Sequence, residues 1–337
     1  MRKLNLADVD NSLNSLTTTY AGEFAGQYIS AALLSGNTLA QGAITIKPNV
    51  KYQEVIKKLD LTESLTAATC DFTLSADKVT LTERILTPTE LQVNLQLCKK
   101  DFRSDWEAIQ MGFSAYDQLP PSFADFLIGQ VAAKVAETVE NTIWNGEVGG
   151  ATGYALFDGF IHKLANATAS IPDGQEVSGT TITAANVITE LGKVADAIPN
   201  SLYGKDDLVI YVPQNVARAY VRALGGFSTV TLQESAANVS ITDVGANGTN
   251  AQGTQWYNGG GLTFDGIKIF VANGLPSNKI VAAEKSNLFF GTGLLADHNE
   301  VKVIDMADID GSQNVRMVMR ATAGVEIGVL EDVVIYS

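Results

Sequence analysis

The chain has 337 residues, 46% of them hydrophobic, with 37 Asp or Glu and 23 Lys or Arg, so its formal net charge is −14. This apolar content excludes a largely disordered chain, and a length above the roughly 250–300 residues of a single core predicts more than one lobe. The acidic balance disfavours a tight general binder of nucleic acid, because such proteins carry basic surfaces.

Residues 1–42 are predicted to form an arm that needs a neighbour for its order. Tyr20, Phe24 and Tyr28 recur at intervals of four, which indicates a short amphipathic helix. Glycines within it and flanks rich in Ser, Thr and Asn make that helix unstable alone. The first residues contain no apolar segment typical of a secretion signal, and no apolar run is long enough to predict a membrane span.

Residues 43–98 alternate between apolar and polar side chains, a pattern that predicts an extended β-hairpin. A half-polar hairpin of this length, with little to bury on either face, is unstable by itself in water. It is therefore expected to rest on another element. Four lysines cluster in this segment: Lys47, Lys51, Lys57 and Lys58.

Residues 122–145 are the longest strongly helical stretch, within a segment spanning 99–182. Its apolar residues recur every four positions: Phe123, Leu127, Val131, Val135, Val139 and Ile143. Because a helix repeats every ~3.6 residues, this row winds around the helix. The two ends of the helix are therefore expected to contact different partners.

Residues 183–275 resemble an α/β lobe, with predicted helices at 183–199 and 213–226 around a strand at 207–212. The tract 227–261 contains only two charged residues and indicates an interaction surface or partial strand. Later strands, with Asp265-Gly266 as a turn signal, continue through 276–337. Val315, Met317 and Met319 recur at every second position, as in a half-exposed antiparallel sheet. The predicted fold class is α+β.

Residues that could support catalysis are sparse. His162 and His298 are the only histidines, and each is interpreted as a surface or turn residue. The sequence lacks a Gly-x-Ser-x-Gly elbow, a P-loop and zinc-ligand spacing. Cys70 and Cys98 could pair, although free thiols are favoured. No catalytic or cofactor-binding residue is predicted.

Two further motifs are weak. Asp305, Asp308 and Asp310 before Gly311 suggest calcium, but the carboxylate expected at position 306 is Met306, so a turn capped by Asp is favoured. The glycines of 257–262 lack a following helix start, which favours a flexible loop over a phosphate cradle. No metal site is predicted.

With enzyme motifs missing, the order of the segments and their local sequences become informative. An arm, a lysine-bearing hairpin, a long helix, an α/β lobe and closing strands follow one another. The sequence stretches that resemble a known family include "LQVNLQLCKKDFRSDWEA", "ENTIWNG", "FDGFIHKL", "TAANVITELGKVADAIP", "DLVIYVPQNVARAYVRAL" and "VRMVMRATAGVEIG". The chain resembles the major capsid proteins of tailed bacteriophages, which have the Hong Kong 97-type fold.

The resemblance implies an extended E-loop at 43–98 and a spine helix at 122–145 in a peripheral domain of 99–182. It implies an axial domain at 183–275, with 276–337 returning to the peripheral domain. The implied function is structural: pentamers and hexamers build an icosahedral head around double-stranded DNA, without catalysis, cofactor or membrane. Implied partners are copies of the chain, portal, scaffolding and decoration proteins. The implied location is the virion, after assembly in the cytoplasm of a bacterial host.

The resemblance also makes the E-loop and the arm interface candidates, namely Lys47, Lys51, Lys57, Lys58, Tyr20, Phe24 and Tyr28. Some family members cross-link an E-loop lysine to a neighbour, but ion pairs or solvated positions are preferred for these lysines. Two other interpretations remain open. One is an encapsulin-type nanocompartment shell that encloses enzymes, and the other is a metabolic α/β enzyme.

Overall fold

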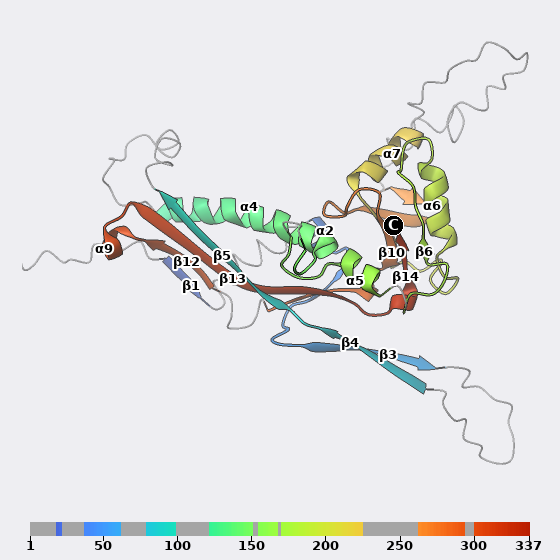
Figure 1. Cartoon of the computed structure of the whole chain (residues 1–337), viewed down its shortest axis with the longest axis horizontal. Coiled ribbons are helices and arrows are strands. Elements are labelled where there is room, and N and C mark those ends of the chain that lie inside the picture. Colours follow the sequence, from blue (N-terminus) through green and yellow to red (C-terminus); the bar gives the residue numbers. More distant parts are fainter. Residues whose placement is uncertain are drawn as a thin grey trace, which may run out of the picture.

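The structure is a computed structural model that describes residues 18–21, 37–61, 79–98, 121–150, 154–167, 170–224, 262–293 and 300–337. Figure 1 shows an elongated molecule in which a long helix lies along one sheet and an α/β lobe stands at the other end. A two-stranded ribbon projects away from both. The predicted α+β class is confirmed.

The first sheet is built around one long strand. Its strands are β1 (Thr18–Ala21), β12 (Glu300–Asp305), β13 (Asn314–Ile327), β11 (Leu288–Thr292), β2 (Thr45–Lys47) and β5 (Thr89–Cys98). β13 pairs antiparallel with β12, β11 and β5. Met317 and Met319 are buried while Arg316 and Arg320 are exposed, so the predicted alternation is confirmed.

The long helix α4 (Pro121–Asn145) matches the predicted helix. Val139 and Ile143 are buried in the core that includes the apolar face of the first sheet. At the end of the helix, the ring of Trp144 lies 5.4 Å from that of Phe160 and 5.1 Å from that of Tyr211. Tyr211 belongs to the second sheet, so this end of the helix contacts a second layer through Trp144.

The second sheet forms the α/β lobe. Its strands, in spatial order, are β6 (Glu176–Val177), β14 (Val333–Tyr336), β10 (Ile280–Glu284), β7 (Leu208–Val212), β9 (Ile267–Val271) and β8 (Thr263–Phe264). Tyr211 of β7 faces the core shared with α4, whereas Ile210 packs beneath helices α6 (Val187–Asp196) and α7 (Gln214–Leu224). Both faces of this sheet are therefore covered, which explains the continuous apolar run of β7.

The turn between β8 and β9 follows its sequence signal. Asp265 has φ 49° and Gly266 has φ 77°, the left-handed values that a tight hairpin requires at both central positions. The α/β lobe extends beyond the expected bounds of 183–275, because it also contains β6, β10 and β14. β10 pairs with β7 on one side and with β14 on the other, so strands distant in sequence complete the sheet.

Short elements join these layers. They are α2 (Asn37–Ala40), α5 (Phe160–Asn166), η4 (Lys285–Asn287), α9 (Ala307–Asp310) and η5 (Leu330–Asp332). α2 is tied to α4 by a buried polar network. The hydroxyl of Thr38 donates a hydrogen bond of 2.5 Å to Oε1 of Glu140 and accepts one of 2.9 Å from Nε1 of Trp144. The backbone N–H of Thr38 donates to the other carboxylate oxygen at 3.0 Å. Both oxygens of the buried Glu140 side chain therefore accept hydrogen bonds, which offsets the cost of burying it.

The expected hairpin at 43–98 divides into parts with different partners. β2 and β5 belong to the first sheet, whereas β3 (Glu54–Leu61) and β4 (Val79–Leu86) pair only with each other among the described residues. We call the β3–β4 pair the ribbon. β4 leads through Thr87 and Pro88 directly into β5, so the ribbon is continuous with the sheet.

Candidate assembly surface

The two faces of the ribbon differ in their surroundings. The register pairs Val55 with Ile85 and Leu59 with Leu81, which places these four side chains on one face. The opposite face includes Ile56, Lys58 and Arg84, which are half-buried against the rest of the molecule. The ribbon therefore has an inner face on its own subunit and an outer face directed away from it.

The outer face is apolar and exposed. The exposed fractions are 45% for Val55, 59% for Leu59, 57% for Leu81 and 47% for Ile85. We call these four residues the apolar stripe. Lys57 and Glu83, which pair across the strands between the two apolar pairs, are also exposed. Large apolar side chains gathered on one face typically mark a surface that another molecule covers.

The root of the ribbon packs closely onto the first sheet. Leu86 is fully buried, and a Cβ on Gly291 would lie 2.7 Å from Cδ2 of Leu86. A Cβ on Gly324 would lie 2.9 Å from the backbone O of Thr87. Two glycines of the sheet thus allow the close approach of the root. The ribbon begins from a fixed base, and its apolar stripe points outward.

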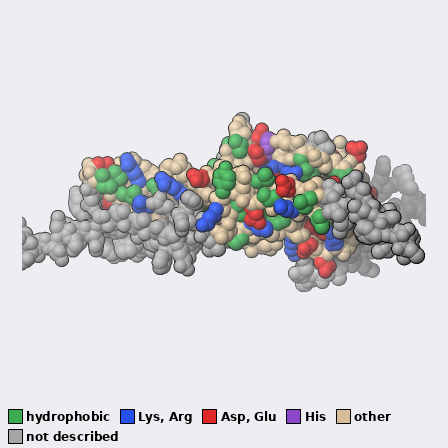
Figure 2. Space-filling model, turned by 90° about the horizontal axis from the view of Figure 1, so that it is seen from below, with side chains coloured by type: hydrophobic (Ala, Val, Ile, Leu, Met, Phe, Trp, Pro, Cys, Tyr) green, Lys and Arg blue, Asp and Glu red, His purple; other side chains and the backbone are tan. Residues whose placement is uncertain are grey.

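Figure 2 looks at the molecule from below, the side on which the ribbon lies in Figure 1. Hydrophobic side chains lie there among Lys, Arg, Asp and Glu side chains. Contact surfaces are on the whole about as apolar as other protein surface, so the registered apolar stripe, rather than this overall composition, marks the candidate surface.

The four lysines have different surroundings. Nζ of Lys47 lies 2.9 Å from Oε1 of Glu54 and 5.7 Å from the ring centroid of Phe289. Lys58 pairs with Glu331, on the inner face of the ribbon. Lys51 and Lys57 are exposed. The structure thus does not gather the four lysines into one site, and their role at an interface stays a prediction.

The expected arm helix is wrong at its first residue. Tyr20 lies in β1, where it pairs with Val301 of β12. Thr18 and Thr19 precede it, and β-branched and aromatic residues favour a strand where an open sheet edge offers backbone partners. Phe24 and Tyr28 lie outside the described residues. Whether Tyr20 contacts another subunit stays a prediction.

Potential catalytic groups are engaged locally. On α5, Nε2 of His162 lies 3.7 Å from Oδ1 of Asp158 and 2.8 Å from the side-chain amide of Asn166. His298 and Cys70 lie outside the described residues, and Cys98 is a free, half-buried thiol at the end of β5. Within the described part of the chain, no group of three His, Cys, Asp or Glu side chains could hold a metal ion.

The turn between β12 and β13 is capped by Asp side chains, as the sequence predicted. Oδ1 of Asp305 accepts a hydrogen bond of 3.0 Å from the N–H of Ala307, and Oδ1 of Asp310 accepts one of 2.9 Å from the N–H of Ser312. Hydrogen bonds from Ser312 lower the pKa of Asp310. Gly311 follows with φ 71°, the left-handed value of a helix end.

An open cavity of about 460 Å³ lies beside α4. Its lining residues are Asn37, Ala133, Ala136, Glu137, Glu140, Asn141 and Asn273. Two carboxylates, those of Glu137 and Glu140, line the cavity, and both have local partners. Glu137 forms an ion pair with Lys134, and Glu140 accepts hydrogen bonds from Thr38. Among the residues that the structure describes, no helix is long and apolar enough to span a bilayer.

Comparison with known proteins gives matches through structure alone. No family model matches the sequence, and no curated protein matches it. The capsid asymmetric unit of cyanophage A-1(L) aligns with TM-score 0.54 and 13% identity, over 89% of this chain and 92% of that one. The capsid of an empty GTA particle aligns with TM-score 0.53 and 12% identity, over 89% of each chain. The capsid of cyanophage P-SCSP1u gives TM-score 0.51 and 13% identity over 88% and 86%.

The chain has the Hong Kong 97-type fold of tailed-phage capsid proteins. The alignments cover about nine-tenths of the chain, so the likeness extends well beyond a single motif. At 12–13% identity the likeness establishes the fold, and the ribbon geometry must support any statement about function.

The apolar stripe on this capsid fold was missed from sequence. The alternation in 54–61 and 79–86 was visible, but its pairing was not. Once Val55 is known to pair with Ile85, four apolar side chains fall on one face of the ribbon, and this face is exposed. The signal that could have found them is the equal spacing of Val55 and Leu59 in one strand and of Leu81 and Ile85 in the other.

Proposed function

We propose that the chain is the major capsid protein of a tailed double-stranded DNA phage. Copies associate as pentamers and hexamers into an icosahedral head around the genome, and the protein has no catalytic role. The capsid fold supports this proposal at the level of architecture. The apolar stripe of the ribbon supports it at the level of chemistry.

The carrying observation is the exposed stripe on a projecting element. Val55, Leu59, Leu81 and Ile85 are roughly half exposed in the single subunit, so covering them removes apolar surface from water and favours association. The exposed pair Lys57 and Glu83 offers one charge of each sign beside them. A second copy of the chain carries acidic and basic groups as well as apolar area, and it is the occupant that a closed shell provides.

The remaining assignments follow from this proposal. Residues 43–98 act as the E-loop, α4 as the spine helix and the α/β lobe as the axial domain. The arm, including Tyr20, Phe24 and Tyr28, contacts neighbours, as do Lys51 and Lys57. Portal, scaffolding and decoration proteins are the expected partners. The protein resides in the virion capsid after assembly in the cytoplasm of the bacterial host, and its acidic balance limits adhesion to the packaged DNA.

The test is electron microscopy of the purified protein after expression, together with extraction of the particle contents. Closed shells with five-fold and six-fold clusters support a capsid subunit, and nuclease-protected DNA in particles from the natural source supports a phage head. Enclosed protein without nucleic acid would indicate the nanocompartment alternative. A strictly monomeric protein under all assembly conditions, with a melting shift on a small metabolite, would indicate an enzyme.

A further inference from the structure

The chain passes from the first sheet to the second through residues 326–332, which we call the inter-sheet connection. It begins in β13 and ends with η5, immediately before β14. The inner face of the ribbon lies against it: a Cβ placed on Gly328 would lie 3.6 Å from Cγ2 of Ile56. A change in the direction of the ribbon therefore has to be accommodated at this connection.

The first charged contact comes from β4. Nε and Nη2 of Arg84 donate hydrogen bonds of 3.0 and 2.7 Å to Oε1 of Glu326, and Nζ of Lys163 lies 2.7 Å from Oε2. Glu326 is only 4% exposed. A buried carboxylate needs such partners, and loss of one leaves a poorly compensated charge. The position of Arg84 is thus strongly specified.

The second charged contact comes from β3. Nζ of Lys58 lies 2.5 Å from Oε2 of Glu331, in η5. Burial raises the pKa of the neighbouring Asp332, and the positive charge of Lys58 acts in the opposite direction. The positive charge of Lys58 therefore acts on both acidic residues of η5, Glu331 and Asp332.

The two contacts lie at different points along the ribbon. Arg84 pairs with Ile56, whereas Lys58 pairs with Thr82, two residues farther from the root. At ~3.3 Å per residue these positions are about 7 Å apart along the strand. One contact would let the ribbon pivot about its root, whereas two contacts at different distances from the root fix its direction.

The inter-sheet connection is itself held in place. Asn287 of η4 is buried, and its side chain accepts a hydrogen bond of 2.6 Å from the N–H of Val329 and donates one of 2.7 Å to its carbonyl. A Cβ on Gly328 would lie 2.9 Å from Oδ1 of Asn287, so the close fit requires glycine. Arg84 and Lys58 therefore contact a segment whose position is itself fixed by Asn287.

We propose that Glu326 and Glu331 are positioning residues for assembly: with Arg84 and Lys58 they set the direction of the ribbon relative to both sheets, and so the curvature of the shell. This rests on the proposed function, because the ribbon must contact a second copy for its direction to matter. In a shell of many copies, a small change in this direction is repeated at every contact. The shell diameter is therefore the quantity that responds.

The experiment compares shells of the wild-type protein with those of Lys58→Gln, Lys58→Arg and Glu326→Gln. The matched control is Glu137→Gln, which removes the exposed Lys134–Glu137 ion pair on α4. Circular dichroism and melting of the dissociated subunit measure folding, and cryo-electron microscopy measures the distribution of particle diameters. Lys58→Gln is included because this half-exposed position is expected to tolerate the change even if Glu326→Gln prevents folding.

We expect Lys58→Gln to leave the subunit folded while shells shift to mixed diameters and open sheets. Lys58→Arg, which keeps the charge, and Glu137→Gln should give wild-type shells. High salt should move wild-type shells toward those of Lys58→Gln, because exposed ion pairs are screened. Uniform wild-type shells from both Lys58→Gln and Glu326→Gln would overturn the inference and leave the proposed function standing. Failure of the wild-type protein to form shells would instead overturn the proposed function.

Discussion

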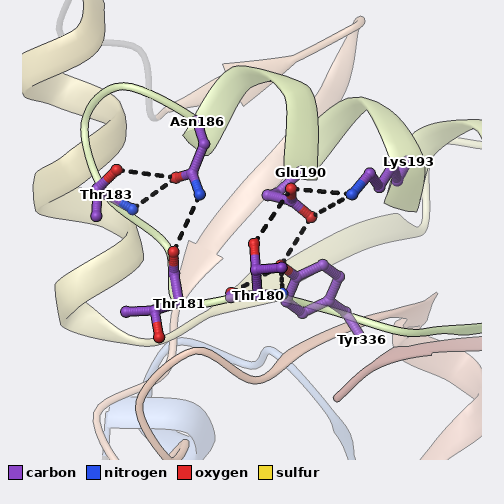
Figure 3. Close-up of polar contacts among 7 residues, drawn as sticks. All are labelled: Thr180, Thr181, Thr183, Asn186, Glu190, Lys193 and Tyr336. Carbon is purple, nitrogen blue, oxygen red and sulfur yellow. Dashed lines mark hydrogen bonds and ion pairs between the residues drawn. The ribbon is translucent and has the colours of Figure 1, made fainter.

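The hydroxyl of Tyr336 lies 2.8 Å from Oε2 of Glu190, which joins the last strand of the chain to helix α6 (Figure 3). Nζ of Lys193 bonds both oxygens of the same carboxylate at 2.9 Å. The N–H of Thr180 donates to the Tyr336 hydroxyl at 2.9 Å. The single hydroxyl proton is directed to the carboxylate because a charged acceptor is the stronger one. A buried charge thus holds β14 against the helix layer.

This network predicts that acid weakens the α/β lobe. The hydrogen bond from Lys193 lowers the pKa of Glu190, although burial acts in the opposite direction. A depressed folded-state pKa contributes stability above the unfolded value of about 4.3. That contribution is lost as the pH falls from there toward the lower folded pKa. The free energy of unfolding, measured by denaturant titration between neutral and acidic pH, should show this loss.

The isosteric variant Glu190→Gln isolates this effect from the other carboxylates. It should be less stable than the wild-type protein at neutral pH, and the difference should shrink below about pH 4.3 as Glu190 becomes protonated. A difference that stays constant across this range would contradict the role assigned to the Glu190 charge.

Tyr336→Phe removes the hydroxyl that is hydrogen-bonded to both Glu190 and Thr180. The buried carboxylate then lacks one donor, so we expect a destabilisation of about 1–3 kcal/mol in chemical denaturation. Tyr203→Phe is the matched control, because Tyr203 is 51% exposed and its hydroxyl contacts the carbonyl of Asp265 at 3.3 Å on the surface. Its effect should stay within about 0.5 kcal/mol. Equal effects of the two substitutions would argue against the network.

Gly274→Ala tests the contact between α4 and the β9–β10 connection. A Cβ at Gly274 would lie 2.1 Å from the carbonyl oxygen of Glu140, so backbone must move and we expect a loss of at least about 1–3 kcal/mol. Gly192→Ala, inside α6, is the opposite case because nothing lies within 4 Å of its Cβ. It should stabilise by about 0.5–1 kcal/mol. Melting temperatures that move in the same direction for both variants would contradict the packing described.

The double variant Leu59→Ser and Leu81→Ser tests the apolar stripe in assembly. Both side chains are exposed in the single subunit, so folding should be little affected. Association should weaken by about 1 kcal/mol or more for each leucine at every contact. Sedimentation should then show folded subunits where the wild-type protein forms shells. Ile309→Ser, at a 67% exposed position on α9, is the control and should assemble normally.

Sequence predicted the elements whose pattern is local. The periodic apolar row of 122–145 and the apolar run of 207–212 appear as α4 and β7 within one residue at each end. The turn at Asp265-Gly266 was also predicted, because its chemistry lies within two residues.

The errors and omissions concern long-range pairing. Tyr20 lies in a strand because β12, far along the chain, offers its edge. Strands β10 and β14 join β7 in one sheet although they fall outside 183–275. The apolar stripe depends on the register between β3 and β4, and alternation within one strand does not specify its partner.

The most direct test of the account is a cryo-electron microscopy structure of the particle at side-chain resolution. We predict a closed shell in which Val55, Leu59, Leu81 and Ile85 of each ribbon are buried against a second copy of the chain. A particle in which these four side chains remain in solvent, or a protein that stays monomeric at every concentration and ionic condition, would contradict the central claim.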